Sequence, residues 1–267
     1  MNLDELRKRI DELDEQIVRL INERARVVLK IAEAKSANGE PFYAPSREGQ
    51  VYQRIRKIND GPISDICLQA VYREIISGSL ALEVPLKVAY LGPEGTFTHS
   101  AARSKFGDCV QYIPGATMDD VFTDVEHERA DYGVVPVENS TGGGIHETLT
   151  RFLNSPLKVC GEIVHDIHHA LMANCEEDEV ERIYSRPQVF GQTRKWIQNH
   201  MPGAELCGVT STSVAAEQAA RDPQSAAIGS ASLAADHGLK VLFDRIEDYS
   251  HNVTRFFVLG RHIASPT

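Results

Sequence analysis

The sequence has little cysteine and no long apolar run. Its 267 residues include five cysteines, which are widely spaced and form no C-x-x-C pair, so neither a zinc knuckle nor a disulfide framework is indicated. No segment approaches the ~20 apolar residues that span a membrane, and the stretch MNLDELRKRI is charged where a signal peptide requires apolar residues. These absences predict a soluble protein that is not exported and works in a reducing cytoplasm.

Excess positive charge is absent as well. The formal net charge is -10, and nearly all of the excess acid lies after residue 85, which argues against nucleic acid as a partner. An anionic small molecule remains compatible where local Arg, Lys or helix N-termini offset the repulsive field. The triple glycine at 142–144 lacks G-x-G-x-x-G spacing, no P-loop lysine motif occurs, and no H-E-x-x-H is present. We therefore predict no cofactor and no metal.

The N-terminal third has the spacing of helices. Apolar residues recur in steps of three and four over residues 3–31, which predicts one long amphipathic helix ending near residue 38. Further helices are expected at 46–58 and 64–83. The first helix would be roughly 50 Å long, more than either later helix can cover. Its exposed apolar stripe predicts an intertwined helical dimer.

Arg24 stands where this spacing predicts an apolar residue, and a charge there is costly unless it is paired or bound to a ligand. At about 100° per residue, Arg24 and Lys35 lie nearly eclipsed on one face, whereas Arg7 lies roughly a quarter-turn away. Arg24 and Lys35 can thus converge on one anion, with Arg7 better placed to serve a partner chain. Ser79 and Glu83 share a face of the third helix. A coiled-coil seam with a register-setting arginine is the alternative.

After residue 85 the pattern changes to short apolar runs that alternate with helical segments, among them KVAYL, YGVVPVEN and RFFVLG. This alternation predicts an α/β domain with largely parallel sheets, in which ligands bind at loops between strand ends and helix starts. Several such loops are rich in hydroxyl and glycine residues, namely GPEGTFTHS, ENSTGGG, TSTS and GSAS. Hydroxyls and free backbone N–H groups at helix N-termini favour a carboxylate or phosphate ligand.

The segment HNVTRFF at residues 251–257 has two interpretations. Asn252-Val253-Thr254 fits a glycosylation acceptor, which would require a secretory route. Alternatively, a polar trio enters an apolar strand for a chemical reason. The lack of an export signal favours the second interpretation, in which Phe256 continues the apolar core.

Residues 1–84 resemble the all-helical chorismate mutases through LRKRIDELDEQIVRLINERARVVLKIAEAK, SRE and EIISGSLALE. Residues 86–262 resemble prephenate dehydratases through AYLGPEGTFTHSAA, DYGVVPVENSTGGGI, IYSRPQVFGQ, AAIGS and NVTRFFVL. Together they are similar to the bifunctional chorismate mutase/prephenate dehydratase family, also called P-proteins. The resemblance implies a multidomain fold: a three-helix, all-α module in an intertwined dimer, then a two-lobed α/β domain of the type-2 periplasmic-binding kind. The lobes would be 86–164 with 244–262, and 165–243.

The resemblance implies that the helical module rearranges chorismate to prephenate. This pericyclic step needs a compact substrate conformer and stabilisation of charge on the breaking ether oxygen. Arg7 of one chain and Arg24 of the other would hold the two carboxylates, with Lys35 donating to the ether oxygen. The other matching positions are Arg47, Glu48 at the ring hydroxyl, Ser79 at a carboxylate and Glu83, where some members carry a glutamine that donates to the ether oxygen.

The second domain, by the same resemblance, converts prephenate to phenylpyruvate with loss of CO₂ and water, in phenylalanine biosynthesis. Its catalytic position is Thr254, whose hydroxyl is too weak an acid to act alone and is interpreted as a hydrogen-bond donor to the departing hydroxide. Arg255 could hold a substrate carboxylate or form a structural salt bridge. The matching cleft positions are Thr96, His99, Glu138, Asn139, Ser140, Thr141, Ser185, Gln192 and Thr212.

The chain departs from the family's pattern at several positions. Ala44 replaces an aspartate of some members, Arg186 replaces a common histidine, and Glu83 can donate to the ether oxygen only when it is protonated. The family usually continues into a phenylalanine-sensing ACT domain, whose motifs do not follow GRHIASPT.

Two rival functions follow from the residues alone. One is a two-lobed anion-binding module fused to a helical dimerisation domain, and the other treats the helical part purely as an interaction coil. Conversion of chorismate to prephenate and phenylpyruvate would exclude both.

Overall fold

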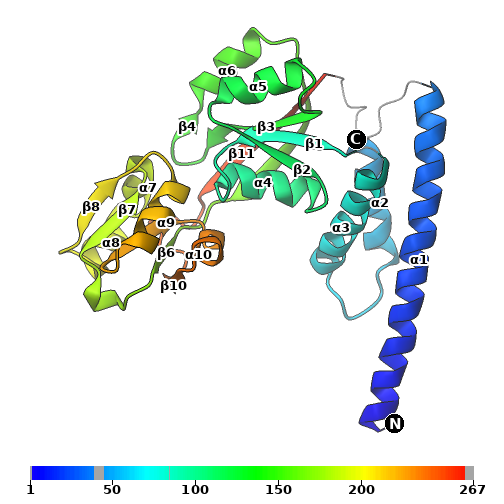
Figure 1. The fold of residues 1–267 in the computed structure, drawn as a ribbon, viewed down its shortest axis with the longest axis horizontal. Helices are drawn as coiled ribbons and strands as arrows, with labels where there is room; N and C mark the ends of the chain where they lie inside the picture. The colour runs from blue at the N-terminus through cyan, green and yellow to red at the C-terminus, as the bar shows by residue number, and fades with distance from the viewer. Residues whose placement is uncertain (1, 39–44, 84, 262–267) are drawn as a thin grey trace. The chain divides into compact units, whose positions relative to one another are not determined.

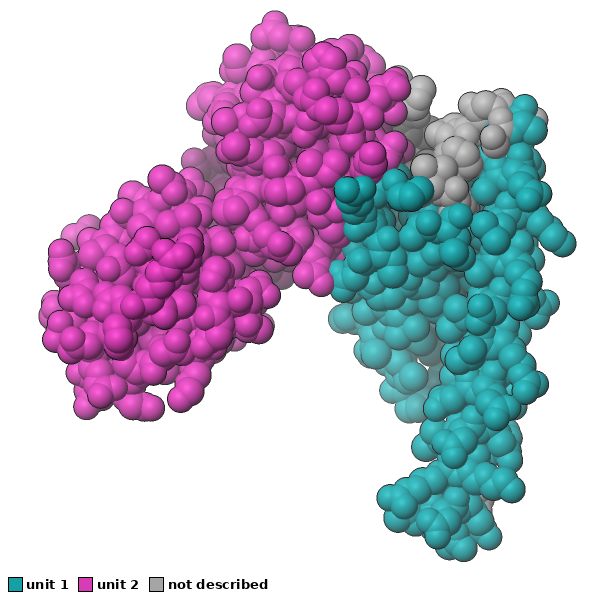
Figure 2. All heavy atoms as spheres, in the orientation of Figure 1, with its two compact units in different colours: residues 1–86, 106–111, 264–267 teal, residues 87–105, 112–263 magenta. Residues whose placement is uncertain are grey.

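The structure is a computed structural model that describes residues 2–38, 45–83 and 85–261. The chain divides into two compact units (Figure 2). The first contains the residues up to Leu86 together with Phe106–Gln111, and the second contains Lys87–Lys105 and the residues from Tyr112 onward. Each unit carries one cavity that is relevant to function.

The first unit consists of helices α1 (Leu3–Asn38), α2 (Pro45–Ile58) and α3 (Asp65–Glu83) (Figure 1). Asn2 and Glu5 exchange backbone-to-side-chain hydrogen bonds of 2.9 Å at the start of α1, as expected of a capping box. Both α1 and α2 pack on α3. The apolar stripe of α1 is largely uncovered within one chain, with exposed fractions of 41% to 57% at Leu6, Ile10, Leu13 and Ile17.

The second unit begins with a sheet in the order β2-β1-β3-β11-β5, with β4 paired to β3. Helices α5 and α6 lie over one face of this sheet and α4 lies over the other (Figure 1). Its core contains Ala89, Phe122 and Leu259, which are fully buried. The elements are β1 (Lys87–Leu91), α4 (Phe97–Phe106), β2 (Gln111–Gly115), α5 (Met118–Glu126), β3 (Tyr132–Asn139), β4 (Gly143–Gly144), α6 (His146–Leu153), β5 (Lys158–Asp166) and β11 (Val253–Gly260).

A second sheet of the same unit has the order β10-β6-β9-β7-β8. Its core includes Leu171, Ile183 and Ile228, all fully buried. The elements are β6 (Ala170–Ala173), η1 (Glu177–Glu179), β7 (Arg182–Ser185), α7 (Pro187–Gln192), α8 (Arg194–His200), β8 (Glu205–Gly208), α9 (Thr212–Arg221), β9 (Ser225–Gly229), α10 (Ser232–His237) and β10 (Lys240–Phe243).

Both sheets are mixed, so the expectation of largely parallel sheets is wrong. The pairs β1–β3, β7–β8 and β7–β9 are parallel, but β11 is antiparallel to both β3 and β5, and β6 is antiparallel to β9 and β10. The chain leaves the first sheet after β5, builds the second sheet and returns as β11. Because β11 returns from the second sheet and is not joined to its neighbours by a βαβ crossover, it can run antiparallel to them. Its insertion places Thr254 opposite Asn139.

Across the described ranges, no helix combines the length and the apolar character that crossing a bilayer requires. Nor does that part of the chain bring three or more His, Cys, Asp or Glu residues together in a group that could hold a metal ion.

Candidate active sites

A cavity of about 480 Å³ lies among the three helices of the first unit. Helix α1 contributes Arg24 and Lys35 to its lining, as their eclipsed positions predict. From the other two helices come Arg47, Glu48 and Ser79. The lining therefore combines cations and a carboxylate with aliphatic side chains, a composition suited to an anionic ring compound.

Arg24 is held in this cavity by α3. Its Nη1 donates to Ser79 Oγ at 2.8 Å, and Ser79 Oγ donates to the carbonyl of Ile75 at 2.7 Å. No carboxylate within the described residues forms an ion pair with Arg24. A part-buried guanidinium without a counter-ion is costly, and a bound carboxylate offsets that cost through charge-assisted hydrogen bonds.

Glu48 is only 7% exposed and receives a hydrogen bond of 2.9 Å from Tyr52 Oη. Burial, with Glu48 beside it, raises the pKa of the Tyr52 phenol, so the phenol stays protonated and keeps donating. Tyr52 was not among the predicted residues, and neither was Arg54, which lines the cavity. The available signal was spacing, since Arg47 and Arg54 lie two helical turns apart on one face of α2.

Of the other predicted mutase residues, the structure shows the side chain of Arg7 but not that of Glu83. Arg7 does not line the cavity of its own chain, and its Nη1 lies 3.7 Å from Asp4 Oδ1 at the surface. Glu83 is the last residue of α3, but its side chain lies outside the described part of the chain, as does all of Ala44.

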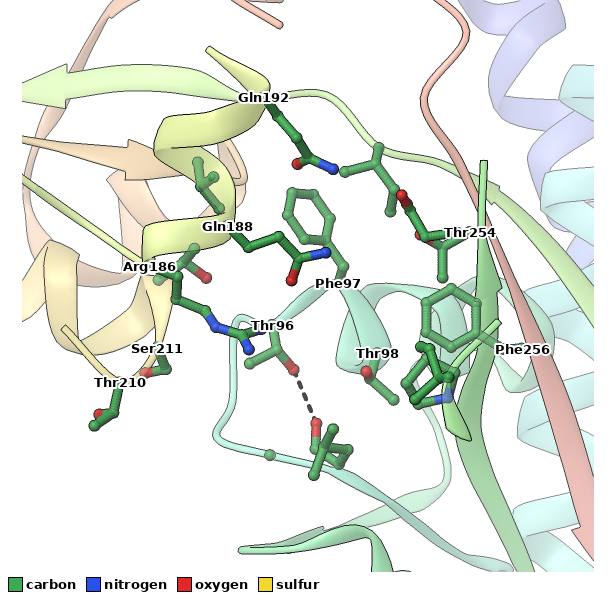
Figure 3. Close-up of a pocket in the computed structure, with 18 of the residues that line it drawn as sticks. Thr96, Phe97, Thr98, Arg186, Gln188, Gln192, Thr210, Ser211, Thr254 and Phe256 are labelled. Atoms are coloured by element: carbon green, nitrogen blue, oxygen red, sulfur yellow. Dashed lines mark hydrogen bonds between the residues drawn. The ribbon is translucent and has the colours of Figure 1, made fainter. Parts of the chain in front are cut away.

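The second cavity, of about 320 Å³, lies in the α/β unit. Strand β11 supplies Thr254, the loop after β1 supplies Thr96, and the last residue of β3 is Asn139. Helix α7 and the start of α9 supply Gln192 and Thr212. Figure 3 shows side chains from both sheets' elements directed into this space. The volume is at the small end of the roughly 300–1,000 Å³ range of small-molecule sites.

Thr254 is positioned by Asn139 across the β3–β11 ladder. Asn139 Nδ2 donates to Thr254 Oγ1 at 2.8 Å and to Asn252 Oδ1 at 3.0 Å. Asn139 Oδ1 accepts from Thr141 Oγ1 at 2.6 Å. Both Asn139 and Thr254 are buried, with exposed fractions of 8% and 7%. These contacts define which end of the Asn139 amide faces Thr254.

The hydrogen bonds continue from Thr141 to the second sheet. Gln192 Nε2 donates to Thr141 Oγ1 at 2.8 Å, and Gln192 Oε1 lies 2.8 Å from His169 Nε2. Because an amide oxygen only accepts, His169 must carry its proton on Nε2. Burial lowers the pKa of His169, so its ring is neutral. Each residue in this series donates a hydrogen bond to the next, in the order His169, Gln192, Thr141, Asn139, Thr254.

Some of the predicted cleft residues support the backbone without lining the cavity. Ser140 Oγ donates to the carbonyl of His251 at 3.0 Å and accepts from the amide of Val253 at 3.0 Å, which ties the loop after β3 to the start of β11. Ser185 is fully buried, and its Oγ donates to the carbonyl of Ile228 at 2.7 Å.

Charged and aromatic candidates also lie outside the second cavity. Arg255 pairs with Glu138 at 2.8 Å and with Glu162 at 2.6 Å, which is the salt-bridge alternative left open for this strand-borne arginine. The hydrogen bond from Arg255 lowers the pKa of Glu162. His99 Nδ1 accepts from the amide of Gly95 at 3.2 Å, and its ring stacks on Tyr90 at a centroid distance of 4.7 Å.

Several lining residues were absent from the prediction. His169 is 1% exposed and was set aside because the histidines lack metal-site spacing. Phe256 was assigned to the core, and it is 1% exposed there, yet it also faces the cavity (Figure 3). The signal was available, because residues two apart on a strand share a face and Thr254 precedes Phe256 by two. The others are Leu91, Gly92, Phe97, Thr98, Ala116, Pro136, Ile145, Ile167, Gln188, Val189, Thr210 and Ser211, whereas Arg186, noted as a departure from the family's pattern, also lines the cavity.

Comparisons with known proteins agree with this two-part arrangement. The chorismate mutase type II family matches residues 6–84, and the prephenate dehydratase family matches residues 88–264. A bifunctional chorismate mutase/prephenate dehydratase of Aquifex aeolicus is 43% identical over 99% of this chain and 75% of its own length. The enzyme of that name from Pseudomonas aeruginosa is also 43% identical, over 98% of this chain and 74% of its own length.

Among solved structures, the prephenate dehydratase of Arthrobacter aurescens in complex with L-Phe is similar to the α/β part. It shows 32% identity and a TM-score of 0.64, over 68% of this chain and 62% of that one. Taken with the matches to both family profiles, these similarities show that the chain belongs to the bifunctional chorismate mutase/prephenate dehydratase family and converts chorismate through prephenate to phenylpyruvate in phenylalanine biosynthesis.

Proposed function

We propose that the cavity among α1, α2 and α3 holds chorismate. Arg24, supported by Ser79, would bind a carboxylate, and Lys35 would donate to the ether oxygen whose bond breaks. Glu48 would accept a hydrogen bond from the ring hydroxyl, with Arg47 beside it. Because no group is transferred to the protein, the contribution of these side chains is to hold the compact conformer and to stabilise developing charge.

A second copy of the chain would complete this site. The support is the apolar stripe of α1, which one chain leaves exposed, and the surface position of Arg7, which fits a role in the partner's cavity. Glu83 would donate to the ether oxygen in its protonated form. We thus propose a cytoplasmic homodimer joined through residues 1–84. The dehydratase domain would be 86–262, with lobes at 86–164 plus 244–262 and at 165–243.

In the dehydratase cavity, Thr254 would assist departure of hydroxide. The reaction breaks the bond between the ring and its carboxylate, which leaves as CO₂. The electron pair of that bond moves into the ring and expels the ring hydroxyl, which becomes water on gaining a proton. A hydrogen-bond donor at the departing oxygen stabilises the charge that develops there.

One observation carries the assignment of Thr254. Its oxygen accepts from Asn139, and the series from His169 through Gln192 and Thr141 holds that amide in orientation. The hydroxyl proton of Thr254 is therefore left to donate to a ligand in the cavity. Thr96, Gln192 and Thr212 would contact the substrate directly, whereas Glu138, Ser140, Thr141, Ser185, His99 and Arg255 would support the walls of the site.

The test supplies chorismate and follows prephenate and phenylpyruvate over time. Wild-type protein should release phenylpyruvate, whereas Thr254→Val should accumulate prephenate, with a dehydratase kcat lowered by about 10²- to 10³-fold, the effect expected of removing one preorganised donor. Thr254→Ser, which keeps the hydroxyl, serves as the matched control. A Val variant within about threefold of wild type would assign hydroxide departure to another group.

A further inference from the structure

Among the described residues that line the dehydratase cavity, Arg186 is the one whose side chain carries a charge at neutral pH. Of the described residues in the lining, only Arg186 and His169 have ionisable side chains, and burial lowers the pKa of His169. The other polar groups are hydroxyls and amides, such as Thr96 and Gln188. Arg186 is therefore the main electrostatic determinant of how an anionic substrate lies in this cavity.

The guanidinium of Arg186 is available to a ligand. Arg186 occupies the N-cap position of α7, and its side chain forms no hydrogen bond or ion pair with any residue of the described ranges. Figure 3 shows the guanidinium directed into the cavity beside Thr96. A planar fork of N–H donors in this position matches a carboxylate in a two-point contact.

The two ends of the cavity suit the two ends of prephenate. Figure 3 shows Arg186 on one side and Thr254 on the opposite side. In prephenate the ring hydroxyl and the carbon that bears both carboxyl-containing substituents lie across the ring from each other. A substrate whose hydroxyl faces Thr254 therefore directs its carboxylates toward Arg186.

We propose that Arg186 binds the carboxylate of the pyruvyl side chain, which is retained in phenylpyruvate, in a substrate whose ring hydroxyl faces Thr254. The other carboxylate loses its charge as it leaves as CO₂. A cation on that group would stabilise the ground state more than the transition state and slow the reaction. The retained carboxylate keeps its charge throughout, so contact with Arg186 strengthens binding without opposing decarboxylation.

This inference rests on the proposal that Thr254 contacts the departing hydroxyl, and it predicts a kinetic result of its own. A contact made equally in substrate, transition state and product raises KM when it is lost and leaves kcat nearly unchanged. Since phenylpyruvate keeps the same carboxylate, its inhibition constant must rise in parallel. A residue that only shaped the fold would not link these two constants.

The experiment measures dehydratase kcat and KM for prephenate, and the inhibition constant of phenylpyruvate, in the full chain. Arg186→Gln should raise KM and the inhibition constant by about 10- to 100-fold each, the range expected for a charge-assisted hydrogen bond, with kcat within about threefold. Arg186→Lys should retain part of both effects, because it keeps the charge but not the fork. Arg221→Gln, an exposed arginine of α9 paired with Glu217, controls for loss of charge.

The outcomes separate the alternatives. Unchanged KM and inhibition constants in Arg186→Gln would overturn the proposal, as would a rise in KM with unchanged phenylpyruvate inhibition, which would place Arg186 on the departing carboxylate. A dehydratase kcat that stays within about threefold of wild type reports that the α/β unit of the same variant is folded, because mutase turnover depends on the other unit. Thr254→Val should lower kcat and leave phenylpyruvate inhibition intact, so failure of the Thr254 assignment is distinguishable from failure of this one.

Discussion

The two cavities proposed to bind chorismate and prephenate, substrates with two carboxylates each, present different chemistry. Among the described residues, the mutase cavity is lined by the cations Arg24, Lys35, Arg47 and Arg54 and by one carboxylate, that of Glu48. The polar side chains that line the dehydratase cavity are mostly hydroxyls and amides. The difference follows from the reactions. A pericyclic rearrangement benefits from cations that hold the whole dianion, whereas an elimination needs one directed donor and few cations near the carboxylate that must leave.

The largest effect that would test this comparison is expected at Arg24. Arg24→Leu should lower mutase kcat/KM by about 10²- to 10³-fold, because it removes a partly buried, hydrogen-bonded charge from its anionic ligand. Dehydratase activity on supplied prephenate should be unchanged. Arg19→Leu is the matched control, since Arg19 is exposed on the same helix and pairs with Glu15. Unchanged mutase turnover in Arg24→Leu would contradict the proposal that Arg24 binds a substrate carboxylate.

The two sites also differ in whether one chain forms the whole site, since only the mutase site is proposed to need a residue from a partner chain. The double variant Ile10→Glu, Ile17→Glu places charge on the exposed stripe of α1. It should convert a dimer to monomers in light scattering and lower mutase kcat/KM by about 10- to 100-fold through loss of the partner's Arg7 contact. Dehydratase kcat should persist. Gln16→Glu, an exposed position on the same helix, should leave the dimer intact, and monomeric variants with full mutase activity would refute the shared site.

The two units also differ in how much their sequence reveals. Helix α1 was predictable because its apolar spacing is regular over many turns. Strand β6 was missed, since Ala170–Ala173 is short, fully buried and without alternation. Motifs pointed to Thr254 and Asn139 as site residues, and the structure places both at the cavity. Their connection to His169 was not predictable, because it depends on β11 returning between β3 and β5 and on contacts between distant segments.

A smaller effect would test whether the hydrogen-bonded series matters only to the dehydratase. Gln192→Glu keeps the oxygen facing His169 but removes the N–H that donates to Thr141. Dehydratase kcat should fall about tenfold, the size of one hydrogen bond of ~1.4 kcal/mol, with mutase kinetics unchanged. Gln198→Glu, exposed on α8, is the control. Equal dehydratase rates in the two variants would show that the hydrogen bond from Gln192 to Thr141 does not affect catalysis at Thr254.

The smallest expected effect is on stability in acid. Burial lowers the pKa of His169, while Gln192 and Glu247 oppose that shift and His168 adds to it. A histidine whose folded pKa lies below its unfolded value stabilises the protein above the unfolded pKa, and this contribution is lost as pH falls, because the unfolded chain takes up the proton first. The stability of the α/β unit should therefore decline below about pH 6.5 by up to about 1.4 kcal/mol per pH unit from this group.

Denaturant unfolding of wild type and His169→Gln at pH 7, 6 and 5 measures this contribution. The variant should lose less stability on acidification than wild type, and His200→Gln, a replacement of an exposed histidine on α8, should follow wild type. Identical slopes for wild type and His169→Gln would mean that His169 accepts a proton in the folded protein as readily as in the unfolded chain. Below about pH 6.5 the donor series would then begin at a charged imidazolium, and the near absence of charge that distinguishes the dehydratase cavity from the mutase cavity would not hold in acid.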